Sequence, residues 1–134
     1  MARPRHENPT PAELEVLHIL WRTGPSTVRD MMDELNRGPA RPRAYTTVMS
    51  LLNIMADKGL VRRRRKGRAF LYHAKVTREK TLRRILGDVV ERAFEGSASA
   101  LVANLLDQAR PDREELDDIG RTIAEYRRQK ETGR

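Results

Sequence analysis

The stretch of residues 44–72 constrains the fold of this chain more than any other part of it. Four apolar residues recur there at i, i+3, i+4 and i+7, which predicts an amphipathic helix that begins near residues 42–45 and ends before Gly59. They are Val48, Leu51, Leu52 and Met55. Two strands at about residues 60–65 and 68–74, joined around Lys66 and Gly67, predict a β-hairpin. From Arg62 to Arg68 this hairpin carries six basic residues and no acid.

A helix followed directly by a basic hairpin is the arrangement with which winged-helix proteins bind DNA. The helix enters the major groove and the hairpin, called the wing, lies along the phosphates. Strand alternation implies that about half of the wing cations face one side of the hairpin. We therefore expect a DNA-binding module, in which the wing supplies affinity and the helix reads sequence.

The outer face of the predicted helix supports this division. Thr46, Ser50, Asn53 and Asp57 share that face, whereas a merely solvated face is usually rich in Lys and Glu. Short hydroxyl and amide side chains suit base edges and phosphates, which the helix must approach closely. We predict DNA contacts from the following residues of the helix, its entrance and the wing: Arg43, Tyr45, Thr46, Thr47, Ser50, Asn53, Arg62, Arg63, Arg64, Arg65, Lys66 and Arg68.

Plainer interpretations of the same residues stay open at this point. The hydroxyls and amide of the helix are also explained as caps and surface residues. A basic run is often a solvated face, or a patch for heparin or acidic lipid. A protein-interaction adaptor with a basic face and an RNA-binding regulator are therefore the alternatives. The RNA alternative is weaker, because the chain has only six aromatic residues and shows no stacking platform.

The remaining elements divide the chain into three parts. We expect a disordered tail at residues 1–9, a winged-helix domain at residues 10–75 and a helical dimerisation region at residues 76–134. In the second part, Thr10, Pro11 and Glu13 form a strong helix start, and Ser26 or Thr27 caps a second helix to about residue 36. The expected fold class is mainly α, an α+β winged helix with a C-terminal helical region.

Residues 76–134 contain three predicted helices with wide apolar faces, at about 77–94, from 97 or 99 onward, and at about 113–130. So small a segment buries too little surface to be stable alone, so its apolar faces need a partner. A second copy of the chain is the simplest partner, and packing on residues 1–74 is the alternative. The predicted dimerisation residues are Leu82, Ile85, Leu86, Val89, Leu101, Val102, Leu105, Leu116, Ile119 and Ile123.

Charge and composition further limit the class of protein to which this chain can belong. The formal net charge is +8, and residues 1–74 hold 14 Lys and Arg against 7 Asp and Glu, whereas residues 75–134 hold 13 against 12. The positive field therefore belongs to the N-terminal half. The chain has no cysteine, no signal-peptide pattern and no run of 18 apolar residues, so we expect a cytoplasmic protein without membrane insertion. His6, His18 and His73 lack ligand spacing, and we expect no catalytic site, metal or cofactor.

With these residues in hand, the chain resembles the penicillinase-repressor family, the BlaI- and MecI-like repressors that are also grouped with copper repressors of the CopY type. The matching segments run in the family's order through roughly residues 10–110. They are Pro11–Leu17, Leu20–Trp21, Gly24–Pro25, Thr27–Arg29, Ala44–Val48, Lys58–Val61, Gly67–Ala69, Tyr72 and Ser99–Val102.

The resemblance implies a homodimeric winged-helix repressor of transcription that binds pseudo-palindromic double-stranded DNA operators. It also implies release through a membrane-bound sensor protease system, which cuts relatives at an Asn–Phe bond. That bond falls on Asn104–Leu105 here, with leucine in place of the aromatic residue, and a plain helix-surface role is the alternative for Asn104. Copper-sensing relatives carry a C-terminal cysteine cluster that this chain lacks, which disfavours copper sensing.

Overall fold

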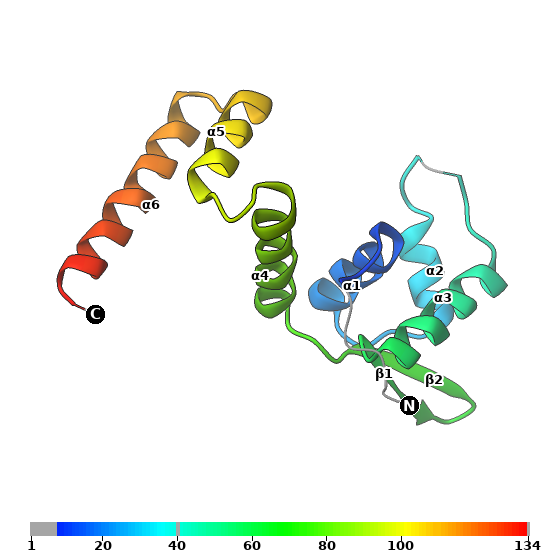
Figure 1. Ribbon diagram of the computed structural model, residues 1–134. Helices are drawn as coiled ribbons and strands as arrows, with labels where there is room; N and C mark the ends of the chain where they lie inside the picture. Colours follow the sequence, from blue (N-terminus) through cyan, green and yellow to red (C-terminus); the bar gives the residue numbers. More distant parts are fainter. Residues whose placement is uncertain (1–7, 40, 134) are drawn as a thin grey trace. The chain divides into compact units, whose positions relative to one another are not determined.

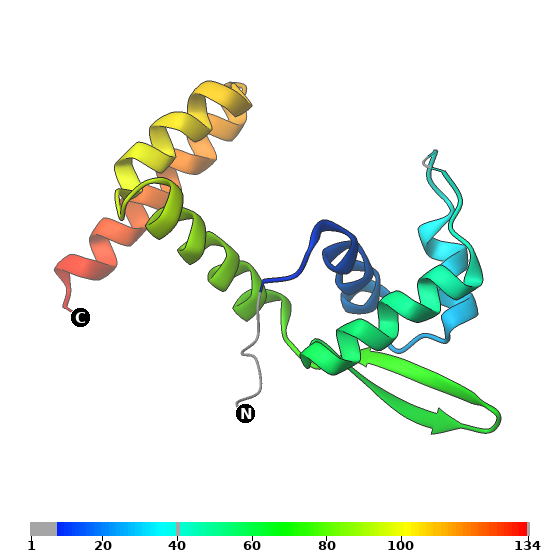
Figure 2. The ribbon, with the colours of Figure 1, turned by 45° about the vertical axis from the view of Figure 1, so that its right-hand side comes forward.

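The computed structural model describes residues 8–39 and 41–133. The order of its elements is α1 (Pro11–Thr23), α2 (Val28–Leu35), α3 (Tyr45–Lys58), β1 (Val61–Lys66), β2 (Ala69–Ala74), α4 (Arg78–Asp88), the π-helical segment η1 (Val89–Ala93), α5 (Ala98–Ala109) and α6 (Arg113–Glu131) (Figure 1). The expected mainly helical α+β class is confirmed. Three helices followed by a two-stranded antiparallel hairpin are the winged-helix topology (Figure 2).

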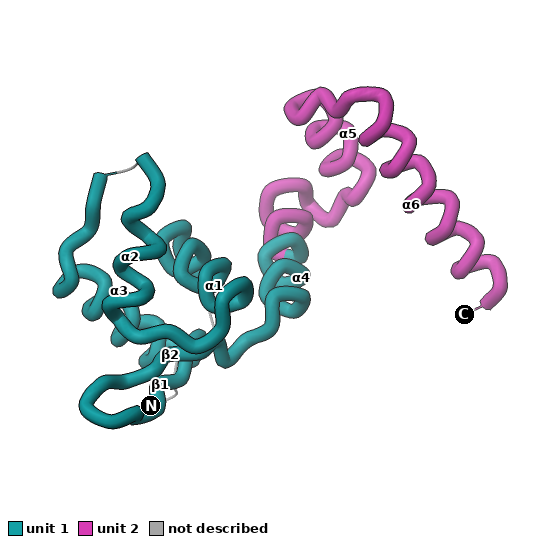
Figure 3. Tube along the Cα trace, turned by 180° about the vertical axis from the view of Figure 1, so that it is seen from behind, with its two compact units in different colours: residues 1–87 teal, residues 88–134 magenta. Residues whose placement is uncertain are grey.

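The chain forms two compact units, Met1–Gly87 and Asp88–Arg134 (Figure 3). The first unit thus contains the winged helix and nearly all of α4. The functional division that we expect at residue 75 stays a prediction, because compactness alone does not say which residues bind DNA or dimerise. Of the tail that we expect to be disordered, residues 1–7 lie outside the described residues.

The first two helices begin with the side-chain caps that their sequences encode. The Thr10 hydroxyl accepts a hydrogen bond from the backbone N–H of Glu13, whose carboxylate in turn accepts the Thr10 N–H, so the predicted capping box is present. Thr27, rather than Ser26, caps α2 and forms the same reciprocal pair with Asp30. Both caps satisfy backbone donors that a helix start would otherwise leave without partners.

Ser26 instead ties the wing to the helices. Its backbone N–H donates to the Tyr72 carbonyl at 3.0 Å, and the Tyr72 N–H donates back to the Ser26 carbonyl at 2.8 Å. This bridge extends the two-stranded sheet by one residue pair. The base of the wing is therefore held by the loop between α1 and α2, while Figure 2 shows its far end projecting from the helices.

The turn from α3 into the wing depends on one glycine. Gly59 directly follows Lys58, the last residue of α3, and caps the helix. It adopts the left-handed conformation with φ of +83°, which favours glycine. The strands begin and end one residue away from several of their predicted limits. They pair from Val61 with Ala74 to Lys66 with Ala69, so the loop has only two residues, Gly67 and Arg68.

The core lies where α1, α2 and α3 meet the base of the wing. Its side chains are Val16, Leu17, Ile19, Leu20, Val28, Met31, Leu35, Val48, Leu52, Met55, Leu60, Val61 and Tyr72. Three of the four predicted core residues of α3 are fully buried, and Leu51 packs partly buried against them. Trp21 is a core-edge residue, and its indole N–H donates to the Val76 carbonyl at 3.0 Å.

A buried ion pair joins the ends of α1 and α3. The side chain of Glu13 is only 3% exposed, and its two carboxylate oxygens lie 3.0 and 2.9 Å from Lys58 Nζ. Glu13 also completes the cap of α1, so one carboxylate serves two elements. The start of α1 and the end of α3 are thereby held together, which orients the helix that carries the polar outer face.

The helix that we predict to run to Phe94 changes character before it ends. Regular α-helical bonding stops at Asp88, and η1 follows with π-helical geometry. The segment then ends at Glu95 and Gly96, both with positive φ, so the predicted break at Gly96 is present.

The second unit buries little of its own apolar surface. Neither α5 nor α6 contains a buried residue. The predicted dimerisation residues Leu105 and Leu116 are 52% and 46% exposed, and Ile123 is 47% exposed. Packing within the chain therefore leaves these apolar side chains uncovered.

Candidate nucleic-acid interface

The outer face of α3 carries the polar row that its sequence predicts. Thr46, Ser50, Asn53 and Asp57 are all exposed, while Val48 on the opposite face has no exposed surface. The N-cap is Ala44, which has no side-chain capping bond. The threonines at the helix start therefore lie within the first turn and are not N-caps, which removes capping as the explanation for Thr46 and Thr47. The first turn has no side-chain cap, and backbone N–H groups at such a helix start are suited to binding a phosphate.

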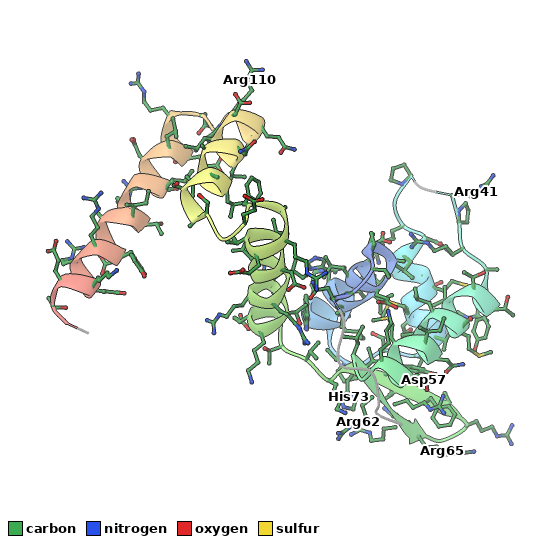
Figure 4. The ribbon with its side chains drawn as sticks, in the orientation of Figure 1. Arg41, Asp57, Arg62, Arg65, His73 and Arg110 are labelled. Carbon is green, nitrogen blue, oxygen red and sulfur yellow. The ribbon has the colours of Figure 1, made fainter. Side chains whose placement is uncertain are left out.

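The strand register divides the wing cations between the two faces of the hairpin, as predicted. Residues that pair directly across the strands share a face. Arg63 pairs with Tyr72 and Arg65 with Phe70, so these two arginines lie on the face that meets the helices. The other face carries Arg62, Arg64 and Lys66. Figure 4 shows Arg62 and His73 near the base of the hairpin and Arg65 toward its loop.

Asn53 connects the polar row of α3 to the wing. Its side-chain oxygen accepts a hydrogen bond from Arg63 Nη1 at 3.0 Å and from the Tyr72 hydroxyl at 3.4 Å. Tyr72 is only 2% exposed, so this oxygen is bound to the fold on one side and to a wing cation on the other. The amide oxygen is therefore already used, and Asn53 orients Arg63 beside the helix. Sequence spacing placed Asn53 correctly but did not indicate this contact.

Phe70 lies beneath two of the wing cations. The guanidinium carbons of Arg63 and Arg65 lie 5.2 and 5.6 Å from the centre of its ring. Both distances are within the range of cation–π attraction. The aromatic ring therefore holds two positive charges on the helix-facing side of the wing, where phosphates are expected.

The entrance of α3 is held by contacts within the fold. The Asn36 side chain accepts the Arg43 N–H at 2.8 Å and donates to the Arg43 carbonyl at 3.1 Å. The Arg43 guanidinium forms an ion pair with Glu15 at 2.8 Å, so a DNA contact from it would compete with that pair. Tyr45 is 43% exposed. DNA contacts from Arg43 and Tyr45 stay predictions.

A hollow opens between the starts of α2 and α3 and the outer part of the wing. Its lining includes Thr27, Arg29, Tyr45, Met49, Arg68 and Phe70. Sequence reasoning selected only Tyr45 and Arg68 from this set. Arg29 and Met49 carry no pattern of their own, and only the meeting of three elements brings them together.

Neither a metal site nor a membrane-spanning helix is found in the part of the chain that the structure describes. Within residues 8–39 and 41–133, no three His, Asp or Glu side chains are grouped in a way that could hold a metal ion. In the same residues, no helix combines the length and apolarity that crossing a bilayer requires.

The predicted cleavage position lies in a regular part of α5. Asn104 is exposed, and its side-chain amide donates to the Ala100 carbonyl one turn earlier at 2.9 Å. Leu105 follows at 52% exposure. A protease would reach both side chains, but it would have to unwind this part of α5 to cut the peptide bond.

Comparison with known proteins agrees with the predicted family. The family described as penicillinase repressor matches residues 9–125. The transcriptional regulator BlaI of Mycobacterium tuberculosis is 34% identical over 115 residues, which are 84% of this chain and 80% of that protein. The penicillinase repressor of Bacillus licheniformis is 22% identical over 119 residues, covering 89% of this chain and 91% of that protein.

Among solved structures, the chain is similar to the monomeric form of Bacillus licheniformis BlaI in complex with the blaP half-operator. The TM-score is 0.47 at 21% identity, over 56% of this chain and 89% of that one. The family's members are repressors of transcription and not enzymes. Because the family match spans most of the sequence, this chain belongs to the penicillinase repressor family.

Proposed function

We propose that this protein is a sequence-specific transcriptional repressor that binds pseudo-palindromic double-stranded DNA operators as a homodimer in the cytoplasm. The observation that carries the proposal is the link between Asn53 and Arg63, at 3.0 Å. It joins the polar face of α3 and the basic wing into one surface, so a helix in the major groove and a wing on the phosphates can act together.

The two parts of this surface have different tasks. Thr46 and Ser50 face outward from α3 and carry hydroxyls suited to base edges. The wing cations contact phosphates, which carry no sequence information. Helix residues therefore decide which DNA is bound, and the wing decides how tightly any DNA is held.

A titration of wild type and two variants tests this division. A duplex is first selected by the full-length protein from a random-sequence pool, and a scrambled duplex of equal length serves for comparison. We expect Arg65→Ala, on the helix-facing side of the wing, to weaken binding to both duplexes alike and to flatten the salt dependence by about 0.9 in the log–log slope. Ser50→Ala should instead reduce the preference for the selected duplex. Equal behaviour of the two variants, or no preference by the wild type, would contradict the proposed function.

The homodimer rests on the second unit. Its helices α5 and α6 bury none of their residues within the chain, and a second copy is the simplest cover for their apolar faces. A two-fold dimer would also place two reading helices on the two halves of a pseudo-palindrome.

Release by proteolysis is the remaining part of the proposal, with a membrane-bound sensor protease system as the partner. The test is to treat producing cells with a β-lactam and to look for a fragment ending at Asn104 by mass spectrometry. Leu105→Phe restores the aromatic residue of the family's cleavage site. A cut in both proteins supports release by cleavage. A cut only in the Leu105→Phe variant means that leucine has made this chain resistant, and a cut in neither means that a β-lactam does not release this protein by cleavage at Asn104.

A further inference from the structure

Three of the exposed large apolar side chains of the winged helix gather around one hollow. Among the described residues between positions 11 and 74, four large apolar side chains are exposed: Tyr45 at 43%, Met49 at 38%, Ile54 at 48% and Phe70 at 40%. Three of them, all except Ile54, line the hollow between α2, α3 and the wing. Neither phosphate binding nor base reading by the polar row explains why apolar surface is exposed there.

The rest of the lining is cationic or neutral. Arg29 comes from α2 and Arg68 from the two-residue loop of the wing, and Thr27 is the N-cap of α2. Among the described residues, no acidic side chain lines the hollow. The side chains of Arg63 and Arg65 add positive charge next to the ring of Phe70. An occupant should therefore have an apolar part flanked by negative charge.

The hollow also has a defined place relative to the two elements that bind DNA. Tyr45 and Met49 lie on α3 one turn apart, in the row next to Thr46 and Ser50 on the wing side. The opposite wall is the wing. A protein with a helix in the major groove and a hairpin along the phosphates beside it must straddle the backbone strand at the edge of that groove.

We propose that the hollow binds a deoxyribose–phosphate segment of that strand. The apolar face of a deoxyribose packs on Tyr45, Met49 and Phe70, and the flanking phosphates are held by Arg29 and Arg68. The inference rests on the proposed function and deepens it, because it assigns Arg29, Met49 and Phe70 to a contact that is independent of sequence.

A sugar contact has a signature that separates it from the other contacts of the interface. It is the same at every nucleotide, so its loss weakens binding to any duplex by the same factor. It neutralises no phosphate, so the salt slope stays constant. A contact with the methyl group of thymine would instead depend on sequence, and a phosphate contact would change the slope.

The experiment measures binding of full-length Met49→Ala, Arg29→Gln and Ile54→Ala to the selected and scrambled duplexes over a range of salt. We expect Met49→Ala to weaken binding to both duplexes by a common factor of about five, with an unchanged slope. Arg29→Gln should weaken binding to both and flatten the slope by about 0.9. Ile54→Ala, the exposed apolar control outside the hollow, should bind like the wild type. Thermal unfolding of each variant checks that the fold is intact.

Several outcomes would overturn the assignment. A Met49→Ala loss confined to the selected duplex means that the hollow reads a base, and no loss means that it does not contact DNA. An equal loss in Ile54→Ala means that any exposed apolar side chain matters. The proposed function fails in a different way, namely if the wild type shows no preference for its selected duplex. The two failures are therefore distinguishable.

Discussion

At the scale of single residues, the pair of Glu13 and Lys58 has the clearest energetic role. Lys58 is 28% exposed while Glu13 is almost fully buried, so removing the lysine leaves a buried carboxylate without its counter-charge. We expect Lys58→Ala to lower the free energy of unfolding by about 2 kcal/mol, less than for a fully buried pair because solvent reaches the lysine. Urea denaturation measures this change. Breaking the surface pair of Arg22 and Glu34 by Arg22→Ala is the control and should cost at most about 0.5 kcal/mol.

The contact between Asn53 and Arg63 makes a second prediction at this scale. Because Asn53 orients Arg63, removing either side chain should remove most of the benefit of the other. We expect Asn53→Ala and Arg63→Ala to be non-additive in DNA-binding free energy, with a coupling of about 0.5–1 kcal/mol. Arg64 is the matched control, since it is the next residue along β1 and lies on the other face. Additive effects for Asn53 with Arg63 would show that the contact does not matter in the complex.

At the scale of elements, the wing depends on its two-residue loop. Gly67 has φ of +62° and is the first of the two loop residues, the position that requires glycine in a type II′ turn. A Cβ atom there would meet nothing within 4 Å, so the penalty for substitution comes from backbone conformation alone. We expect Gly67→Val to lower stability by about 1 kcal/mol and to weaken binding to all duplexes. Gly67→Asn should do less harm, because asparagine tolerates positive φ. Equal effects of Val and Asn would show that tolerance of positive φ does not decide the stability of this turn.

The elements also show how far the sequence was informative. Helix caps and the apolar row of α3 are local patterns, and the positions that they predict for Thr10 and Val48 agree with the structure. The alternation of the wing is also local, and it divides the wing cations between two faces as predicted. The change to π-helical bonding at Val89 was not predictable, since the apolar stripe continues through it without interruption. The ion pair of Glu13 with Lys58 spans 45 residues and has no local signature.

The candidate site also contains a part that local patterns predict and a part that they miss. The wing cations and the polar row each lie within one short segment, so the sequence alone predicted them. The hollow, in contrast, is formed by side chains from α2, α3 and the wing together. Arg29 and Met49 look like ordinary helix residues until these elements meet. Sites made by several elements are therefore the part of the interface that pattern analysis misses.

At the scale of the whole molecule, the two compact units differ more in net charge than residues 1–74 differ from residues 75–134. Residues 1–87 carry 19 Lys and Arg against 8 Asp and Glu, whereas residues 88–134 carry 8 against 11. The additional cations lie within α4 and just before it, at Lys75, Arg78, Lys80, Arg83 and Arg84. A strongly basic unit attracts DNA at long range, and a weakly acidic unit has no such attraction, which suits it to association with a second protein chain.

Association through the second unit can be tested at the apolar stripe of α6. Leu116 and Ile123 are two turns apart on α6, are both nearly half exposed, and lie on the apolar stripe that we assign to the dimer. We expect Leu116→Glu to convert the dimer to monomers in sedimentation equilibrium and to weaken operator binding at least about tenfold, since each half-site then binds alone. Ala124→Glu introduces the same charge on α6 away from the stripe and should stay dimeric. Both variants should bind a single half-site duplex like the wild type, because the winged helix is unchanged. A monomeric wild type, or dissociation of both variants, would contradict the assignment of this stripe to the dimer.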